Sequence, residues 1–436
     1  MASPRTDDRP LTVPHEVAAP QSALRTALAG LIGNVLEWFD FAVYGYFASD
    51  IGSQFFPSSS HSAQQLLAFA VFALGFVARP FGSLVLGMVG DRIGRRALLT
   101  LSIALMGGAT LVLGLLPTYA QIGVAAPVLL VAMRLVQGFS LGGEFTGSMV
   151  YTTEKASPLM RGIVSSSTAA GTTIGFILGS GSAWLVNSLL TDAQVASWGW
   201  RIPFVGSIIF CIVGWYLRRG ISETAEGLKA AAVRPALIPS LLADWKPILQ
   251  TFGIVAMTNA AYYLTFTYAV ERRKSLTGEG GNAFLLANTL TLVVVLFAKP
   301  LGGWLSDRTG RRRLMLALTG AMMVAILPAL QMMLFGTPQQ FTVGQVLLAV
   351  PIGMALGLQG AMVVEIFPLR TRVTSMSFAY SITLALAGGT APLVSTWLIE
   401  TWGMPLAPAF YIMLYGLIGI ALMVPMAETN TRPLDD

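Results

Sequence analysis

The chain has 436 residues, of which 54% are hydrophobic and only 11% are charged. A water-soluble globular protein of this length would need more polar surface, so the composition excludes that class and predicts a lipid-facing exterior. The net charge of +6 requires no nucleic-acid partner, because the topology of a membrane protein accounts for where the basic residues fall.

Twelve long apolar segments recur along the chain, each close to the roughly 20 residues that a helix needs to cross the hydrocarbon core. The sequence therefore predicts an all-α membrane protein with twelve transmembrane helices. Residues 1–25 are polar and contain no apolar core before a cleavage site, so we expect no removable signal there. In chain order the predicted segments are 26–48, 65–89, 98–116, 122–150, 163–190, 200–217, 247–270, 281–303, 314–335, 339–363, 374–399 and 406–427.

Lysine and arginine are distributed unequally between the two sides of these segments. Of the 27 basic residues, 20 fall in tails and loops on one side, and cytoplasmic loops are the ones that retain such an excess. We therefore expect both termini to be cytoplasmic. Cys211 is the single cysteine, which excludes an internal disulfide or a multi-cysteine metal site.

Two loop motifs occur twice at nearly the same offset. A Gly-x-x-x-Asp-Arg-x-Gly-Arg-Arg motif begins at Gly87 and again at Gly303, and a Glu-x6-Arg pattern begins at Glu154 and again at Glu365. Repeats of this kind predict a duplicated transporter fold. The predicted organisation is a cytoplasmic tail at 1–25, six-helix bundles at 26–217 and 247–427, a cytoplasmic linker at 218–246, and a cytoplasmic tail at 428–436.

The charges of these loops lie at the membrane edge. There an acid can meet a helix N-terminus or a basic partner in one conformation and separate from it in another. A topology-setting basic loop is the alternative for one copy, but the matched second copy argues against it. We predict gating roles for Asp91, Arg92, Arg95, Glu154, Arg161, Asp307, Arg308, Arg311, Glu365 and Arg372.

Ionisable residues inside the predicted segments indicate the mechanism, because each costs about 2.5–3.5 kcal/mol at a helix centre. Glu37 and Asp40 share a helix face, and Arg134 lies at a depth where it could meet Glu37. Glu144, ten residues beyond Arg134, is a second candidate. We predict Glu37, Asp40 and Glu144 as proton-coupling residues, and a static buried network is the alternative.

Two further cations, Arg79 and Lys299, lie within two or three turns of the cytoplasmic loops. Their long side chains could extend to that interface, which predicts a structural or gating role.

A solute site also needs polar groups among apolar walls. The alternative for the tyrosines is membrane-interface or packing roles. The substrate-binding candidates are Asn34, Tyr44, Arg134, Gln137, Asn259, Tyr262 and Tyr263.

The duplicated loop resembles the hallmark of the major facilitator superfamily. The stretches GNVLEWFDFAVYG at 33–45, RLVQGFSLGGE at 134–144 and WGWRIPF at 198–204 resemble the metabolite:proton symporter family. GGEFTG at 142–147 and TNAAYY at 258–263 are most similar to its proline and betaine branch. The stretch Glu271-Arg272-Arg273-Lys274 departs from that branch in being strongly basic for an outer loop.

This resemblance implies proton-coupled uptake of a small organic solute in a bacterial inner membrane, by a monomer that needs no cofactor except the proton. The solute could be a zwitterion such as proline or glycine betaine, or a di- or tricarboxylate such as 2-oxoglutarate or citrate. A drug:proton antiporter is a second hypothesis, but its fifth helix typically carries a Gly-Pro motif, and residues 171–184 contain no proline. A membrane-embedded enzyme is a third, and the sequence shows no nucleophile–base set, metal cluster or nucleotide loop for it.

Overall fold

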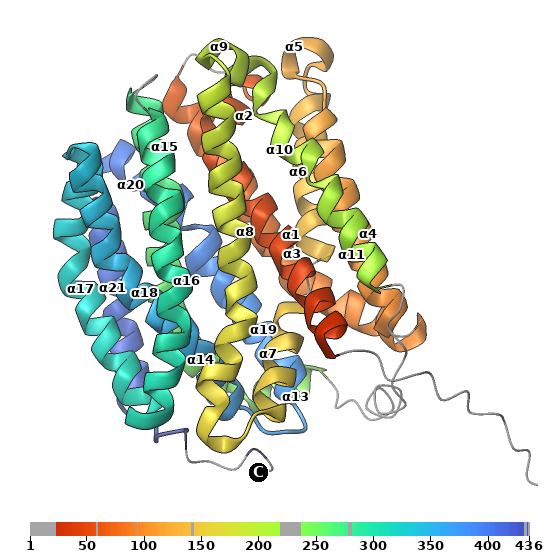
Figure 1. The fold of residues 1–436 in the computed structure, drawn as a ribbon, viewed down its shortest axis with the longest axis vertical. Coiled ribbons are helices and arrows are strands. Elements are labelled where there is room, and N and C mark those ends of the chain that lie inside the picture. The colour runs from red at the N-terminus through yellow and green to blue at the C-terminus, as the bar shows by residue number, and fades with distance from the viewer. Residues whose placement is uncertain are drawn as a thin grey trace, which may run out of the picture.

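The computed structural model describes residues 23–57, 60–93, 95–140, 144–218, 237–277, 281–430 and 434, and within these ranges every regular element is a helix (Figure 1). Side chains are described for the same residues except 23–30, 84, 87–93, 95–99, 144, 217–218 and 237.

The helices of the first half are α1 (Ala23–Tyr46), α2 (Ala48–Phe55), α3 (His61–Ile93), α4 (Arg95–Leu115), α5 (Tyr119–Ile122), α6 (Ala125–Ser140), α7 (Glu144–Lys155), η1 (Pro158–Met160), α8 (Arg161–Leu189), α9 (Asp192–Gln194), η2 (Val195–Gly199), α10 (Arg201–Gly206) and α11 (Ile208–Arg218).

The helices that follow are α13 (Leu237–Ala243), α14 (Trp245–Tyr263), η3 (Leu264–Tyr268), α15 (Ala269–Thr277), α16 (Asn282–Thr309), α17 (Arg311–Phe335), α18 (Pro338–Ile366), α19 (Arg372–Thr383), η5 (Leu384–Gly389), α20 (Ala391–Trp402) and α21 (Ala407–Met423). The end that bears α2, α5, α9 and α15 is the one that the charge distribution predicts to face outward, and we refer to it as the outer end.

All twelve predicted segments contain helix in the residues that the structure describes. In the described residues, seven continuous helices are long and apolar enough to cross a membrane, and the pair Asp192–Gly199 and Arg201–Tyr216, bent by 45°, supplies an eighth. The shorter apolar helices Thr100–Leu115 and Ala407–Met423 occupy the third and twelfth predicted segments. Helices α1 and α14 occupy the first and seventh.

The structure adds local features that the apolar runs did not predict. Helix α2 lies in the predicted first outer loop, and α13 lies in the predicted linker. Two predicted spans contain π-helical turns, η3 and η5, and a third such turn, η2, directly precedes the sixth predicted span. Such turns mark functional sites frequently. Here η5 brings Gly389 so close to the Phe76 ring that a Cβ atom at position 389 would collide with it.

The two halves meet along two seams. Helix α8 packs along α16 on one side, and α3 packs against α19, η5 and α20 on the other. Near the inner end of the first seam, a Cβ atom on Gly303 would lie 2.5 Å from the Gly162 carbonyl oxygen. Glycine at both positions therefore permits the close backbone approach.

Candidate functional site

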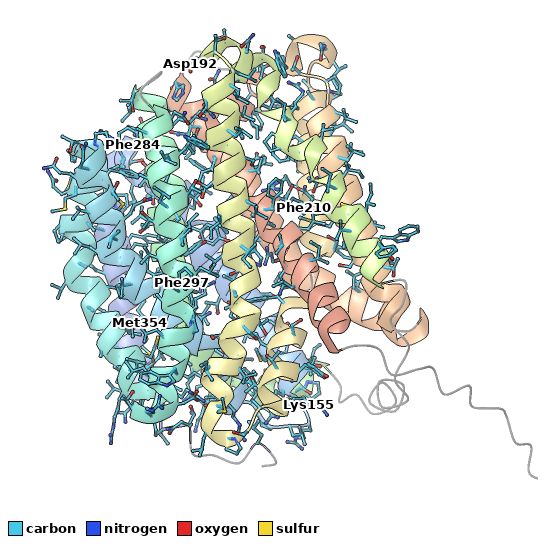
Figure 2. The ribbon with its side chains drawn as sticks, viewed as in Figure 1. Lys155, Asp192, Phe210, Phe284, Phe297 and Met354 are labelled. Atoms are coloured by element: carbon cyan, nitrogen blue, oxygen red, sulfur yellow. The ribbon has the colours of Figure 1, made fainter. Side chains whose placement is uncertain are left out.

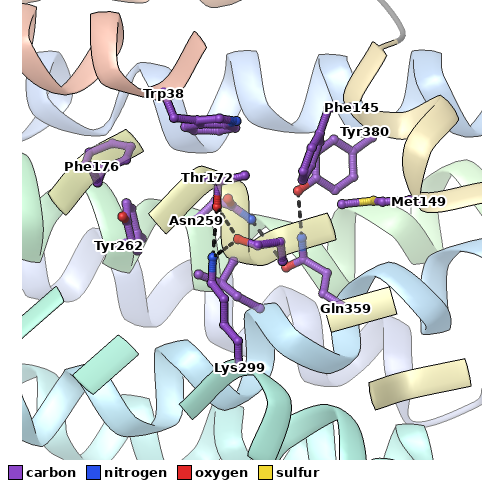
Figure 3. Close-up of a pocket in the computed structure, with 12 residues that line it drawn as sticks. Trp38, Phe145, Met149, Thr172, Phe176, Asn259, Tyr262, Lys299, Gln359 and Tyr380 are labelled. Atoms are coloured by element: carbon purple, nitrogen blue, oxygen red, sulfur yellow. Dashed lines mark hydrogen bonds between the residues drawn. The ribbon is translucent and has the colours of Figure 1, made fainter. Parts of the chain in front are cut away.

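A cavity lies between the two halves near the middle of the molecule. The volume open to the centre of a water-sized sphere is about 20 Å³, which is room for a water molecule or two. Seven helices contribute to its walls (Figure 3). The lining residues are Trp38, Phe145, Met149, Ala169, Thr172, Phe176, Asn259, Tyr262, Lys299, Leu356, Gln359 and Tyr380.

Lys299 places an ammonium group in this cavity. Its Nζ donates to the Ala169 carbonyl at 2.5 Å and to Thr172 Oγ1 at 2.8 Å, both on α8 across the seam. The residue is 1% exposed, and no carboxylate in the described part of the chain forms an ion pair with it. The expectation that Lys299 extends to the inner interface is wrong, because its side chain turns inward to the cavity (Figure 3).

Aromatic rings form much of the remaining wall. The ring of Trp38 lies 6.0 Å from each of the Phe145 and Phe176 rings, measured between centroids. Phe176 packs edge-on to Tyr262 at 4.9 Å, and Phe145 lies 5.6 Å from Tyr380. Aromatic faces attract cations, and an assembly of several is the common way to bind a quaternary ammonium group.

A short chain of polar groups crosses the cavity floor. Asn259 Nδ2 donates to the Val255 carbonyl at 2.9 Å and approaches Gln359 Oε1 at 3.4 Å. Gln359 Nε2 donates to Tyr380 Oη at 3.0 Å. The cavity therefore combines one cation, several aromatic faces and a few orienting amide and hydroxyl groups.

An ion pair lies directly behind the Trp38 wall. Arg79 Nη1 is 2.9 Å from Glu37 Oε1, and both side chains are buried. The Arg79 guanidinium also lies 4.5 Å from the Phe76 ring centroid and 5.2 Å from that of Trp38. The expected placement of Arg79 at the inner edge is therefore wrong, because its side chain pairs with Glu37.

Arg134 has a different partner from the expected one. Its Nη1 lies 2.7 Å from Asp40 Oδ2 and donates to Gln137 Oε1 at 2.8 Å. Asp40 Oδ1 also accepts from Gln137 Nε2 at 2.8 Å and from Thr110 Oγ1 at 3.0 Å. This closed network lies inside the first half, and none of its members lines the cavity.

The predicted substrate-binding residues thus separate into two groups. Asn259 and Tyr262 line the cavity. Tyr263 is buried behind the wall, 6.5 Å from the Trp38 ring, and Tyr44 donates from its hydroxyl to the Ala68 carbonyl. The predicted residues that do not line the cavity are Asn34, Tyr44, Arg134, Gln137 and Tyr263.

The second copy of the loop motif joins the halves at the inner end. Asp307 accepts from the backbone N–H groups of Gly162 and Ile163 at 2.8 and 3.0 Å, so it caps the N-terminus of α8, where negative charge is stabilised. Arg311 donates to Asp307 at 2.8 Å and makes a two-point contact with Glu365 at 3.1 Å.

A further inner contact joins the two halves directly. Arg372 Nη1 lies 2.7 Å from Glu154 Oε1. Arg308 is exposed and stacks on Trp304 of its own helix, and its gating role stays a prediction. Arg161 is buried at the start of α8. The side chains of Asp91, Arg92, Arg95 and Glu144 lie outside the described ones.

Contacts between the halves also close the outer end. The Ser49 backbone N–H donates to Glu271 Oε1 at 2.9 Å, and Lys274 Nζ lies 2.9 Å from Asp50 Oδ2. Contacts between the halves therefore bridge both ends of the molecule, on either side of the central cavity. Opening one end at a time would expose it to one side and then the other.

Sequence reasoning missed most of the cavity wall. The sequence identifies Lys299 as an intramembrane cation, but its short distance from a cytoplasmic loop predicts a side chain that extends to the membrane interface rather than into the cavity. Trp38, Phe145, Phe176 and Tyr380 carry no signal in the sequence that separates them from packing aromatics. Gln359 is the one polar side chain in the run 346–364, and that contrast could have identified it.

Two six-helix bundles that enclose a central cavity and contact each other separately at its two ends define a multi-pass membrane transporter. A family model described as "Sugar (and other) transporter" matches residues 26–226, and one described as "Major Facilitator Superfamily" matches residues 280–435. The chain belongs to the major facilitator superfamily, and its relatives are transporters rather than enzymes.

The chain is similar over nearly its whole length to characterised transporters. It is 33% identical to the proline/betaine transporter of Escherichia coli K12, covering 98% of this chain and 88% of that protein. It is 35% identical to the citrate-proton symporter of Klebsiella pneumoniae, covering 89% and 88%. In structure it resembles the xylose transporter of Escherichia coli in a partially occluded inward open conformation, with a TM-score of 0.72, 16% identity and 94% and 99% coverage.

Proposed function

We propose that this protein is a proton-coupled symporter that takes up a small zwitterion of the proline or betaine type. It acts as a monomer in a bacterial inner membrane with both termini in the cytoplasm, and its two bundles comprise residues 26–217 and 247–427. The observation that carries the proposal is the single buried ammonium of Lys299 in a cavity walled by Trp38, Phe145 and Tyr262.

The two ends of a zwitterion match the two kinds of wall. Its carboxylate would replace the Ala169 carbonyl and Thr172 hydroxyl as the partner of Lys299. Its ammonium would lie against the aromatic rings. Lys299 lies on the second half and its ammonium reaches α8 of the first half across the seam. A solute bound to Lys299 would therefore contact both halves at once, and this would couple solute binding to closure of the two halves around it.

A di- or tricarboxylate is the second candidate solute, and the citrate-proton symporter relative favours it. Lys299 could bind one of its carboxylates. Arg79 is the next cation, but it already pairs with Glu37 behind the Trp38 wall. A second carboxylate would therefore depend on neutral donors such as Asn259 and Gln359, so we rank this class lower.

We assign the coupling proton first to Glu37, since this carboxylate lies next to the cavity residue Trp38 in the chain and its pair with Arg79 is buried. A change in the solute site can alter this pair and so change its affinity for a proton. Asp40, which belongs to the Arg134 network, and Glu144 remain the other candidates.

Uptake into proteoliposomes tests the proposal. Proline, glycine betaine, 2-oxoglutarate, citrate and shikimate are each offered with and without an inward proton gradient. We expect gradient-driven uptake of proline or glycine betaine, its loss in Glu37→Gln, and its retention in Asp192→Asn, a control at an exposed outer acid. Gradient-driven citrate uptake would overturn the solute class, accumulation without a gradient would overturn the coupling, and outward transport would indicate an antiporter.

A further inference from the structure

The basic stretch that sets this chain apart from the proline and betaine branch contributes to a cluster across the outer end. Glu271 and Lys274 lie on α15 of the second half, and Asp50 lies on α2 of the first. Lys274 Nζ donates to the Tyr46 carbonyl at 2.8 Å and to Asp50 Oδ2 at 2.9 Å. Glu271 Oε1 accepts the Ser49 backbone N–H at 2.9 Å.

This cluster is buried and carries two acids for one base. The Glu271 side chain is fully buried, and the side chains of Lys274 and Asp50 are 11% and 14% exposed. Glu271 Oε2 lies 3.6 Å from Lys274 Nζ and has no hydrogen-bond partner in the described part of the chain. An uncompensated negative charge and a free carboxylate oxygen together make a place where a proton can bind.

The other charged groups nearby are engaged elsewhere. Arg272 faces Glu400 of α20 at 3.9 Å. Arg273 donates to the carbonyls of Leu334 and Gly336 and lies over the Phe284 ring. On α3, the uncharged Gln65 donates to Ser49 Oγ. Asp50 and Lys274 are therefore the charges that act on Glu271.

We propose that Glu271 is an outer proton-binding site, and that a proton bound there holds the outer gate between the two halves closed. The proton comes from the outside water and adds to the free Oε2, while Lys274 stays paired with Asp50. When the gate is closed, water does not solvate the cluster, and the bound proton neutralises its excess negative charge. When the gate is open, water solvates this charge instead.

Acid favours whichever state of the gate, closed or open, binds the proton more tightly. Burial, with the charge of Asp50, raises the pKa of Glu271 from 4.5 to about 7, although Lys274 and the Ser49 N–H oppose the change. The pKa of Lys274 is also raised, against the effect of its burial, by Asp50 and Glu271, so this ammonium remains charged. In an open gate Glu271 would meet water and return to its ordinary pKa, so protonation favours closure.

The linkage relation gives the size of the effect. With a pKa of about 7 in the closed gate and 4.5 in the open gate, lowering the pH from 8 to 6 raises the ratio of closed to open molecules about tenfold. A symporter loaded in acidic surroundings must close its outer gate before it opens inward, and this site would favour that step. The proton at Glu271 returns to the outside and is not the transported one.

Distance measurements between spin labels on the full chain test this site. The labels sit at Ala193→Cys, beside the labelled Asp192 in Figure 2, and Leu276→Cys, both exposed at the outer end of opposite halves, in a Cys211→Ala background. We expect the ratio of short to long distances to rise about tenfold between pH 8 and pH 6, with the rise beginning near pH 7.

Two variants distinguish Glu271 from other acids. Glu271→Gln should remove the pH dependence, and Glu400→Gln, an acid of the same end that pairs with Arg272, should retain it. Asp50→Asn should move the onset of this rise to lower pH, because a charge that helps to raise the pKa of Glu271 is gone. The proposal fails if the unmodified chain shows less than a twofold change, if the ratio falls with acidity, or if Glu271→Gln keeps the full response.

Discussion

Replacing Lys299 with methionine tests how the cavity recognises its solute. Methionine keeps most of the length of the side chain and removes its charge and its donors. The Ala169 carbonyl and the Thr172 hydroxyl would each lose a partner, but a buried cation without an acidic partner is removed at the same time. We therefore expect the Lys299→Met protein to fold.

The affinity for a carboxylate solute should fall sharply in this variant. A hydrogen bond to a charged group contributes about 1.5–3 kcal/mol, which corresponds to a dissociation constant about 10- to 150-fold higher. Choline has the ammonium group of glycine betaine without its carboxylate, so its weaker binding should not change. The discrimination between the two ligands should therefore disappear.

Calorimetric titration of the purified protein with glycine betaine and with choline measures this discrimination. Lys246→Met is the matched control, because Lys246 is an exposed lysine near the start of α14, and it should bind both ligands as the unmodified chain does. If Lys299→Met still prefers glycine betaine to choline by the original factor, Lys299 is not the carboxylate partner.

Four other substitutions have defined outcomes. Asp307→Asn should weaken the capping of α8 by up to about 2 kcal/mol and so favour opening of the inner end. Ser377 contacts Thr146 across that end, so a cysteine at position 377 should be alkylated faster in this variant. An unchanged rate of alkylation would contradict the gating role of Asp307. Trp38→Leu should raise KM for glycine betaine about 2- to 30-fold through loss of the aromatic face. An unchanged KM in uptake kinetics would contradict this role of the ring. Asp40→Asn should leave the Arg134 charge buried and lower the free energy of unfolding by about 3–5 kcal/mol, which thermal unfolding would register as a lower midpoint. Tyr263→Phe should change the uptake rate by less than about twofold and the thermal unfolding midpoint by no more than about a degree or two. The reason is that the Tyr263 hydroxyl has no hydrogen-bond partner among the described residues. A large loss would show that this hydroxyl binds solute or proton.

The sequence was sufficient for the helices because lipid imposes a simple length and polarity requirement on each span. It did not predict α2 or α13, since these helices lie outside the long apolar runs. The π-helical turns were also missed. A turn such as η5 depends on tertiary contacts, here the approach of Gly389 to Phe76, and no local pattern records them.

The ion pairs show where sequence reasoning about a membrane site runs out. Depth along a helix can be read from residue numbers. Glu37 and Asp40 are three residues apart, yet they pair with arginines on different helices, α3 and α6. Which arginine each meets depends on how the helices are rotated against their neighbours, and the sequence does not specify this rotation.

Loop chemistry was more predictable than the cavity. An acid at a helix end needs only a nearby helix N-terminus or a base, and Asp307 has both in Gly162 and Arg311. The cavity wall combines side chains from seven helices, so only Asn259 and Tyr262 of the predicted substrate residues line it.

The most direct test of the account is to record proton and solute movement together. Proteoliposomes that contain the protein and an internal pH indicator are given glycine betaine or proline from outside with no imposed gradient. Proton-coupled symport predicts that the interior acidifies as the solute enters, and that Lys299→Met and Glu37→Gln abolish this acidification. Solute influx without acidification in the unmodified protein would contradict proton-coupled symport.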